Sequence, residues 1–224
     1  MQPRGLRVLW THTERGAGGY RGEAVIVTPV LDHGIDFLAS DLVRSPGLHA
    51  SEIYGDLFKK LEPKRYDIRD KGGEPLPLNP VLMAIGTAWE KHFEYLLLKS
   101  GYEVERPQEF MSEDGVAFSP DLIQFNGVTR IWEIKYTSMG AKDMPTEPTN
   151  CLPPKFDKYD AQMKLYAHWL GVHHGTLAVV LNHQPWDPQF RMFNIEWNDR
   201  ELMENYQMCR NHAQHTGSWD RREQ

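Results

Sequence analysis

The stretch that decides the fold is SPDLIQFNGVTRIWEIKYT, residues 119–137. It has the apolar alternation of a β-hairpin around the Asn-Gly pair at 126–127, yet it also carries Asp121, Glu133 and Lys135. Because successive side chains of a strand point to opposite faces, Glu133 and Lys135 share a face. An isolated pair of this kind is most often a surface salt bridge, so the position of Asp121 decides what the pair means.

The length of the hairpin loop sets the position of Asp121. A two-residue Asn-Gly turn would put Asp121 opposite Trp132, pointing away from Glu133. A three-residue loop, with Gly127 in the left-handed region as a G1 bulge, would put it opposite Ile131 and on the face of Glu133. We expect the second loop, because it brings two carboxylates and a lysine within reach of one another across the strands.

These residue types suit a particular chemistry. Asp121 and Glu133 offer two oxygen ligands on neighbouring strands, and the Ile134 carbonyl between Glu133 and Lys135 offers a third. Mg²⁺ prefers oxygen ligands and keeps waters and open positions for a phosphate. A lysine beside such an ion can orient the attacking water and offset developing negative charge. The hairpin therefore predicts hydrolysis of a phosphodiester.

Two expected helices carry further candidates. In GTAWE, Gly86 lies one turn before Glu90, which would let Glu90 project over the glycine toward the site. In QMKLY, Gln162 and Tyr166 lie one turn apart on an aromatic stripe. On their own these are a tolerated glycine with a solvated Glu and a core stripe, but Gln162 needs hydrogen-bond partners that the site would supply.

The remaining elements follow from periodicity and capping signals. The order helix, three strands, helix, two strands, helix indicates an α/β domain with a mixed sheet. Residues 1–50 are a strand-and-turn extension of open role, and residues 51–224 are the domain. The expected helices are 49–61 with Ser51 as cap, 79–101 with Asn79 as cap and Pro80 at the first helical position, 157–170 ending at Gly171, and one from cap Asp199 to about His215. The helix at 79–101 carries an apolar stripe of Leu82, Ile85, Trp89, Phe93 and Leu96. The expected strands are 103–111, 116–125, 128–137, 175–182 and 190–197.

Composition limits the function classes. The chain has 224 residues, 40% hydrophobic content and a formal charge of −6, as expected of a folded domain whose basic residues for a polyanion must be grouped locally. Residues 59–71 form such a group or an ordinary charged surface, and the glycine cluster near Arg15 and Arg21 is a hairpin tip with two potential phosphate contacts. We expect a cytoplasmic protein with no membrane partner, because neither a membrane-spanning run nor a secretion signal is found.

Cysteine and histidine spacing predicts no other metal centre. Cys151 and Cys209 lie far apart without a CxxC partner, so neither a disulfide framework nor an iron–sulfur cluster is expected. His168, His173 and His174 lack the spacing of helical zinc ligands.

Taken in order, Gly86 to Glu90, Pro120-Asp121, Glu133-Ile134-Lys135 and Gln162 to Tyr166 resemble the motifs of the PD-(D/E)xK (restriction-endonuclease-like) nuclease superfamily. The likeness covers about residues 51–197 and is to the RecB-like branch with phage lambda-type exonucleases. It implies a core of a central mixed sheet flanked by helices. Iron–sulfur members of the branch have four cysteines around this core, which this chain lacks.

Carried over residue by residue, the resemblance implies that Asp121 and Glu133 bind Mg²⁺ or Mn²⁺, with Glu90 supporting the metal. Lys135 would be the catalytic lysine. Gln162 and Tyr166 would contact the substrate strand or steady the site.

The expected function is metal-dependent DNA cleavage, as an exonuclease in DNA recombination or processing in a bacterial or phage-infected cell. The alternatives are a structure- or sequence-specific endonuclease with the same site and a catalytically silent DNA-binding module. DNA is the expected partner, and a phage single-strand annealing or binding protein and a homo-oligomer stay open.

Overall fold

The computed structural model describes residues 46–67, 80–137, 144, 152–181 and 188–223. The expected strands and glycine-rich turn before residue 46, the Asn79 cap and most of the long connection after Thr137 lie outside these ranges.

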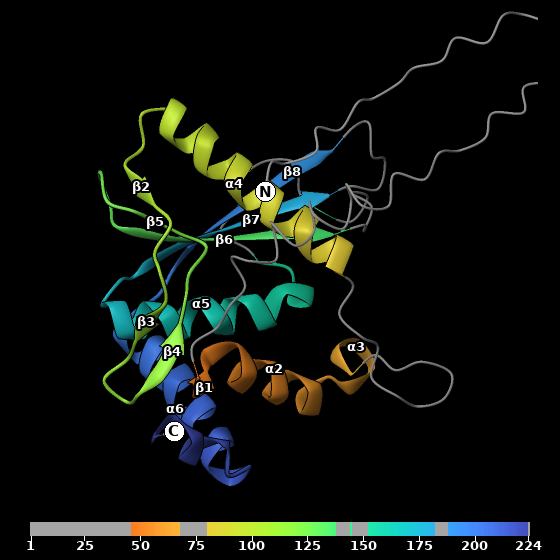
Figure 1. The fold of residues 1–224 in the computed structure, drawn as a ribbon, viewed down its shortest axis with the longest axis vertical. Coiled ribbons are helices and arrows are strands. Elements are labelled where there is room, and N and C mark those ends of the chain that lie inside the picture. The colour runs from red at the N-terminus through yellow and green to blue at the C-terminus, as the bar shows by residue number, and fades with distance from the viewer. Residues whose placement is uncertain (1–45, 68–79, 138–143, 145–151, 182–187, 224) are drawn as a thin grey trace, which may run out of the picture.

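A five-stranded mixed sheet forms the centre of the fold, in the order β2-β5-β6-β7-β8 (Figure 1). Strands β6 and β7 are parallel and the other neighbours are antiparallel. A small sheet, β1-β4-β3, lies beside it. The elements are β1 (Leu48–His49), α2 (Ala50–Leu61), α3 (Pro63–Tyr66), α4 (Pro80–Lys99), β2 (Val104–Glu105), β3 (Phe110–Met111), β4 (Val116–Phe118), β5 (Leu122–Gln124), β6 (Arg130–Thr137), η3 (Pro154–Phe156), α5 (Asp157–Leu170), β7 (His174–Leu181), β8 (Gln189–Glu196), α6 (Asp199–His215) and η4 (Ser218–Glu223).

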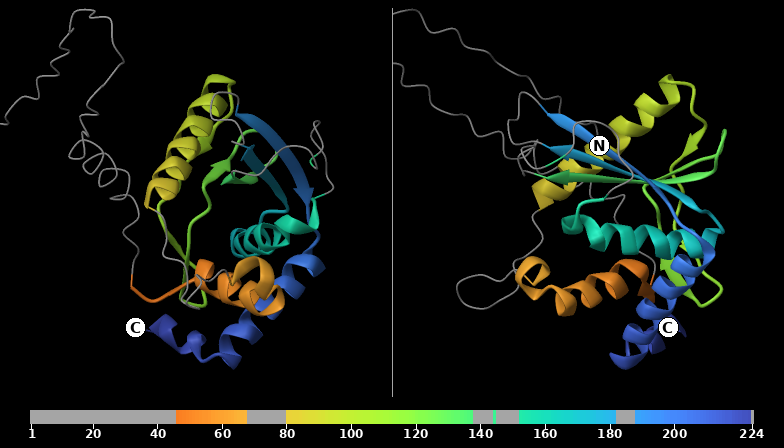
Figure 2. Two further views of the ribbon diagram at one scale, coloured as in Figure 1. Left: turned by 90° about the vertical axis from the view of Figure 1, so that its right-hand side faces the viewer. Right: turned by 180° about the vertical axis from the view of Figure 1, so that it is seen from behind.

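Helices cover both faces of the large sheet (Figure 2). Helix α4 packs on one face, where Phe93 and Leu97 join the cluster of Trp132 and Ile134. Helix α5 packs on the other face, with α2 and α6 outside it, in the larger core that contains Ile131. The opposite placement of Ile131 and Ile134 confirms the predicted alternation along β6.

The predicted meander of three long strands is only partly right. The segment 103–111 forms two short strands, β2 and β3, and 116–125 forms β4 and β5, each pair divided between the two sheets. Both breaks contain a proline, Pro107 and Pro120, which cannot donate a ladder hydrogen bond. The second break, residues 119–121, contains Asp121.

The predicted hairpin loop is wrong in length but right in its consequence. Gln124 pairs with Arg130, so the loop spans residues 125–129 instead of three residues. Asn126 explains the longer loop, because its side chain donates to the Gly101 carbonyl and accepts from the Glu103 N–H, both at 2.9 Å. The register moves by two residues, and a shift of two keeps every side chain on its predicted face. Gly127 has the expected left-handed backbone, with φ +77°.

Helix ends agree with the capping predictions in part. Helix α4 begins at Pro80, and Gly171 ends α5 in the left-handed region, as predicted. The predicted cap Ser51 lies inside α2, whose cap position is His49 without a side-chain bond. Asn198, not Asp199, caps α6, because it forms a capping box with Glu201 that satisfies two N–H groups.

The predicted apolar stripe of α4 is rotated from the observed buried face. Phe93 is buried and Trp89 partly buried as expected, but Leu82 and Leu96 are exposed and Leu97 is buried instead. None of the described helices combines the length and the apolar character that a bilayer crossing needs.

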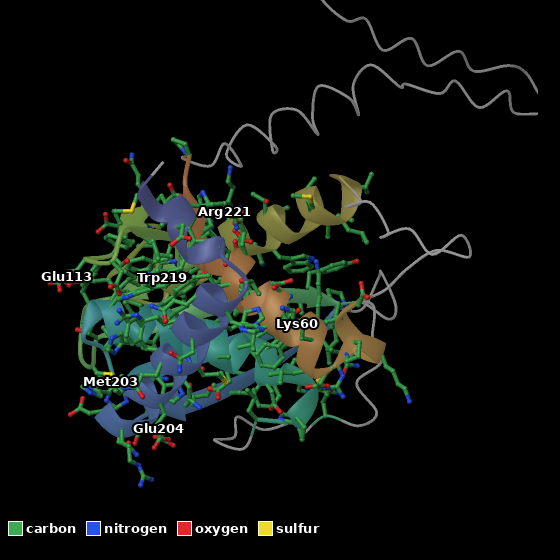
Figure 3. The ribbon with its side chains drawn as sticks, turned by 90° about the horizontal axis from the view of Figure 1, so that it is seen from below. Lys60, Glu113, Met203, Glu204, Trp219 and Arg221 are labelled. Atoms are coloured by element: carbon green, nitrogen blue, oxygen red, sulfur yellow. The ribbon has the colours of Figure 1, made fainter. Side chains whose placement is uncertain are left out.

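The segment η4 lies against the larger core and α2. Trp219 of η4 joins the larger core, and Arg221 donates to Glu52 of α2 at 2.8 Å (Figure 3).

Candidate active site

Glu133 lies at the centre of the site and has no exposed surface. Its Oε1 accepts a hydrogen bond from Gln162 Nε2 at 2.5 Å and is in contact with Lys135 Nζ. Its Oε2 is buried and has no hydrogen-bond partner among the described residues. A buried carboxylate oxygen without a partner is costly, so this atom points to a missing ligand.

Asp121 joins the same group from the position immediately before β5. Its Oδ2 accepts a hydrogen bond from the Ile134 N–H at 2.6 Å and lies 3.6 Å from Lys135 Nζ. The bond has a simple cause: β5 begins at Leu122, so Ile134 has no backbone partner there and the Asp121 carboxylate replaces one. The N–H and C=O of one residue in an antiparallel ladder point to the same neighbour, so the Ile134 carbonyl faces the Asp121 edge too.

Glu90 approaches the site from α4 and is paired with Arg106, which was not among the predicted site residues. Its Oε2 accepts from Arg106 Nη1 at 2.9 Å, and Arg106 Nε donates to Glu94 at 3.1 Å. Arg106 lies in the break between β2 and β3, whose course the sequence did not predict. The expected steric reason for Gly86 is not found, because a Cβ added there meets no atom within 4 Å.

Helix α5 supplies the predicted aromatic stripe with Gln162 as its polar member. Gln162 bridges two groups, since its Nε2 lies 2.5 Å from Glu133 and 3.2 Å from the Tyr166 hydroxyl. Tyr166 is buried and packs on Phe118 with ring centroids 5.6 Å apart. Lys135 Nζ lies 5.5 Å from the centre of the Tyr159 ring. The stripe is therefore both core and part of the polar network.

The buried charges change each other's protonation. Burial, followed by the nearby Asp121 carboxylate, raises the pKa of Glu133 to about 8 despite the Lys135 ammonium. Burial and Asp121 also raise the pKa of Glu90, against the opposing effects of Lys135 and Arg106. For Lys135, burial alone would lower the pKa, but the Asp121 and Glu133 carboxylates outweigh it and raise the pKa well above its usual range. The lysine is thus charged, and Glu133 is where the cluster retains a proton.

The donor set fits a hard divalent cation. Two carboxylates and a backbone carbonyl at one edge are oxygen ligands of the type that Mg²⁺ and Mn²⁺ take, and Glu133 Oε2 has no other partner in the part of the chain that the structure describes. Within the described ranges, no three His, Cys, Asp or Glu side chains form a ready metal cluster.

The three histidines considered for zinc take separate roles. His168 stacks on Tyr206, with ring centroids 4.5 Å apart. His173 Nε2 lies 2.7 Å from Asp199, and His174 Nδ1 lies 3.5 Å from Glu196.

Solved structures provide the comparison for this geometry. No family model and no curated protein sequence matches the chain. An alkaline exonuclease, LHK-Exo from Laribacter hongkongensis, is similar with a TM-score of 0.52 at 17% identity, over 78% of this chain and 90% of that one. LHK-Exo in complex with dAMP gives 0.51 at 18% identity, over 83% and 94%. A phage-related exonuclease from Haemophilus somnus 129PT gives 0.46 at 14% identity, over 76% and 80%.

The chain therefore has the fold of the PD-(D/E)xK nucleases, a central mixed sheet flanked by helices. The predicted fold class is confirmed, and this likeness of fold agrees with the resemblance drawn from the motifs.

Proposed function

We propose that the chain is a metal-dependent DNA nuclease and that it acts as an exonuclease. The observation that carries the proposal is the buried Glu133 carboxylate, which meets Lys135 and Gln162 through one oxygen and leaves the other without a partner. The fold supports the same class, since LHK-Exo is described as an alkaline exonuclease.

In this proposal Asp121, Glu133 and the Ile134 carbonyl hold Mg²⁺ or Mn²⁺, and Glu90 supports them. When bound, such an ion activates water at neutral pH and polarises the phosphate. Lys135 lies between both carboxylates, where its ammonium orients the attacking water and offsets charge that develops on the phosphate. Gln162 fixes the Glu133 carboxylate, and Tyr166 supports Gln162 from the core.

The test is a time course on end-labelled linear and closed circular DNA, with Mg²⁺ and with EDTA. We expect Mg²⁺-dependent loss of the linear substrate only, because an exonuclease needs an end. Asp121→Asn and Lys135→Met should each lower the rate at least a hundredfold, the size found when one preorganised charge or donor is removed.

Matched controls are available on one helix. Asp56 and Lys60 of α2 form an exposed pair 3.8 Å apart, so Asp56→Asn and Lys60→Met make the same charge changes away from the site. Full activity in either site variant would refute the proposal. Cleavage of the circle would make the protein an endonuclease, and absence of cleavage with intact DNA binding would make it a silent binding module.

A further inference from the structure

Lys158 extends the polar stripe of α5 beyond the proposed active site. It lies four residues before Gln162, as Gln162 lies four residues before Tyr166, so the three side chains follow one face of the helix. Four residues advance the helix by about 6 Å. The neighbouring Tyr159 ring contacts Lys135, which places Lys158 at the border of the site.

The ammonium of Lys158 rests on two aromatic rings. Its Nζ lies 5.3 Å from the centre of the Tyr66 ring and 5.8 Å from that of Tyr54. Such ring faces attract a cation without neutralising it. They come from α3 and α2, so three helices fix the position of this one charge.

Lys158 is in a positive environment. In the described parts of the chain no carboxylate forms an ion pair with it, unlike Lys60, Lys135 and Lys164. Burial, and then the ammonium groups of Lys135 and Lys59, lower its pKa. A half-buried cation with two other cations nearby is stabilised most by an anion that comes from outside.

We propose that Lys158 binds a phosphate of the DNA strand next to the one cleaved at Lys135, a contact that rests on the proposed nuclease function. The Tyr54 and Tyr66 rings hold the ammonium in place before DNA arrives. Along this face of α5, Tyr166 supports Gln162 from the core, Gln162 holds the Glu133 carboxylate, and Lys158 contacts a phosphate.

Binding and cleavage test this proposal separately. Fluorescence anisotropy of an end-labelled duplex in EDTA gives Kd without metal or turnover, and steady-state cleavage in Mg²⁺ gives KM and kcat. Lys158→Gln should raise Kd and KM about tenfold, as expected for one lost charge-assisted contact, and leave kcat within about twofold. The slope of log Kd against log salt should fall by about 0.7–0.9.

Two further variants separate a phosphate contact from other roles. Lys158→Arg keeps a cation that stacks on rings and should bind nearly as the unchanged protein does. Arg200→Gln removes one charge from the exposed surface of α6, where Arg200 pairs with Glu204 (Figure 3), and should leave Kd and the salt slope unchanged. Thermal unfolding confirms that each variant is folded.

The outcomes are distinct. Equal Kd and salt slope for folded Lys158→Gln and Arg200→Gln would overturn the proposal, and so would a loss in kcat alone. If the protein binds DNA but never cleaves it, the nuclease function is refuted. A higher Kd for Lys158→Gln would in that case still support the phosphate contact. Absence of DNA binding at low salt would overturn both.

Discussion

Replacing Glu133 by Gln tests the electrostatics of the site without DNA. The pKa of Glu133 is raised from its usual 4.5 to about 8 by burial and by Asp121. A group with a raised folded-state pKa contributes stability that is fully present below its unfolded pKa and is lost as the pH rises through the folded pKa. The window is therefore about pH 4.5 to 8, and Gln has no proton to lose there.

The magnitude follows from proton linkage. Each pH unit within the window lowers the free energy of unfolding of the unchanged protein, relative to Glu133→Gln, by about 1.4 kcal/mol. Between pH 5 and pH 8 the difference should change by several kcal/mol, up to about 4. Urea unfolding of both metal-free proteins across this range measures it, with Glu204→Gln, an exposed Glu of α6, as the control.

A pH-independent difference between the two proteins would refute the reasoning, since it would mean that Glu133 is ionised throughout. Adding Mg²⁺ at pH 8 supplies a second comparison. The ion should stabilise the unchanged protein by about 3 kcal/mol at a hundred times its Kd, and should stabilise Glu133→Gln far less.

Three other predictions concern the support of the site and the fold. Gln162→Leu removes the donor to Glu133 and should move the midpoint of Mg²⁺ binding to higher pH, measured by calorimetry; an unchanged midpoint would contradict the role of this bond. Gly175→Ala should cost about 1–3 kcal/mol in urea unfolding, because its Cβ would lie 2.3 Å from the Trp197 ring and 2.5 Å from the Met163 methyl, and a neutral effect would show that the core yields there. Asn198→Ala should lower the free energy of unfolding by about 1 kcal/mol through loss of the capping box. Asn198→Asp, which can still accept from the Glu201 N–H, should keep most of that stability in urea unfolding.

The sequence was sufficient for those parts of the site that depend on periodicity. Alternation along β6 puts Glu133 and Lys135 on one face, and the helical repeat puts Gln162 and Tyr166 on one face of α5. Both predictions follow from local geometry, so they are correct although the length of the hairpin loop was predicted wrongly. Asp121 kept its predicted side because the register moved by an even number of residues.

Features that depend on distant contacts were not predicted. The loop after Gln124 is longer because Asn126 bonds to the turn at Gly101, far away in the sequence. Arg106 pairs with Glu90 only because the chain leaves the sheet between β2 and β3. Similarly, the aromatic contacts of Lys158 involve three helices, and the residue spacing along α5 does not predict contacts with Tyr54 or Tyr66.

The central claim is that Asp121 and Glu133 form a metal site, and calorimetric titration of Mn²⁺ into the DNA-free protein at pH 8 tests it most directly. We expect Mn²⁺ to bind at one saturable site in the unchanged protein and in the exposed control Asp56→Asn. We expect no binding at this site in Asp121→Asn or in folded Glu133→Gln. Equal Mn²⁺ binding by all four proteins, or no binding by any of them, would contradict it.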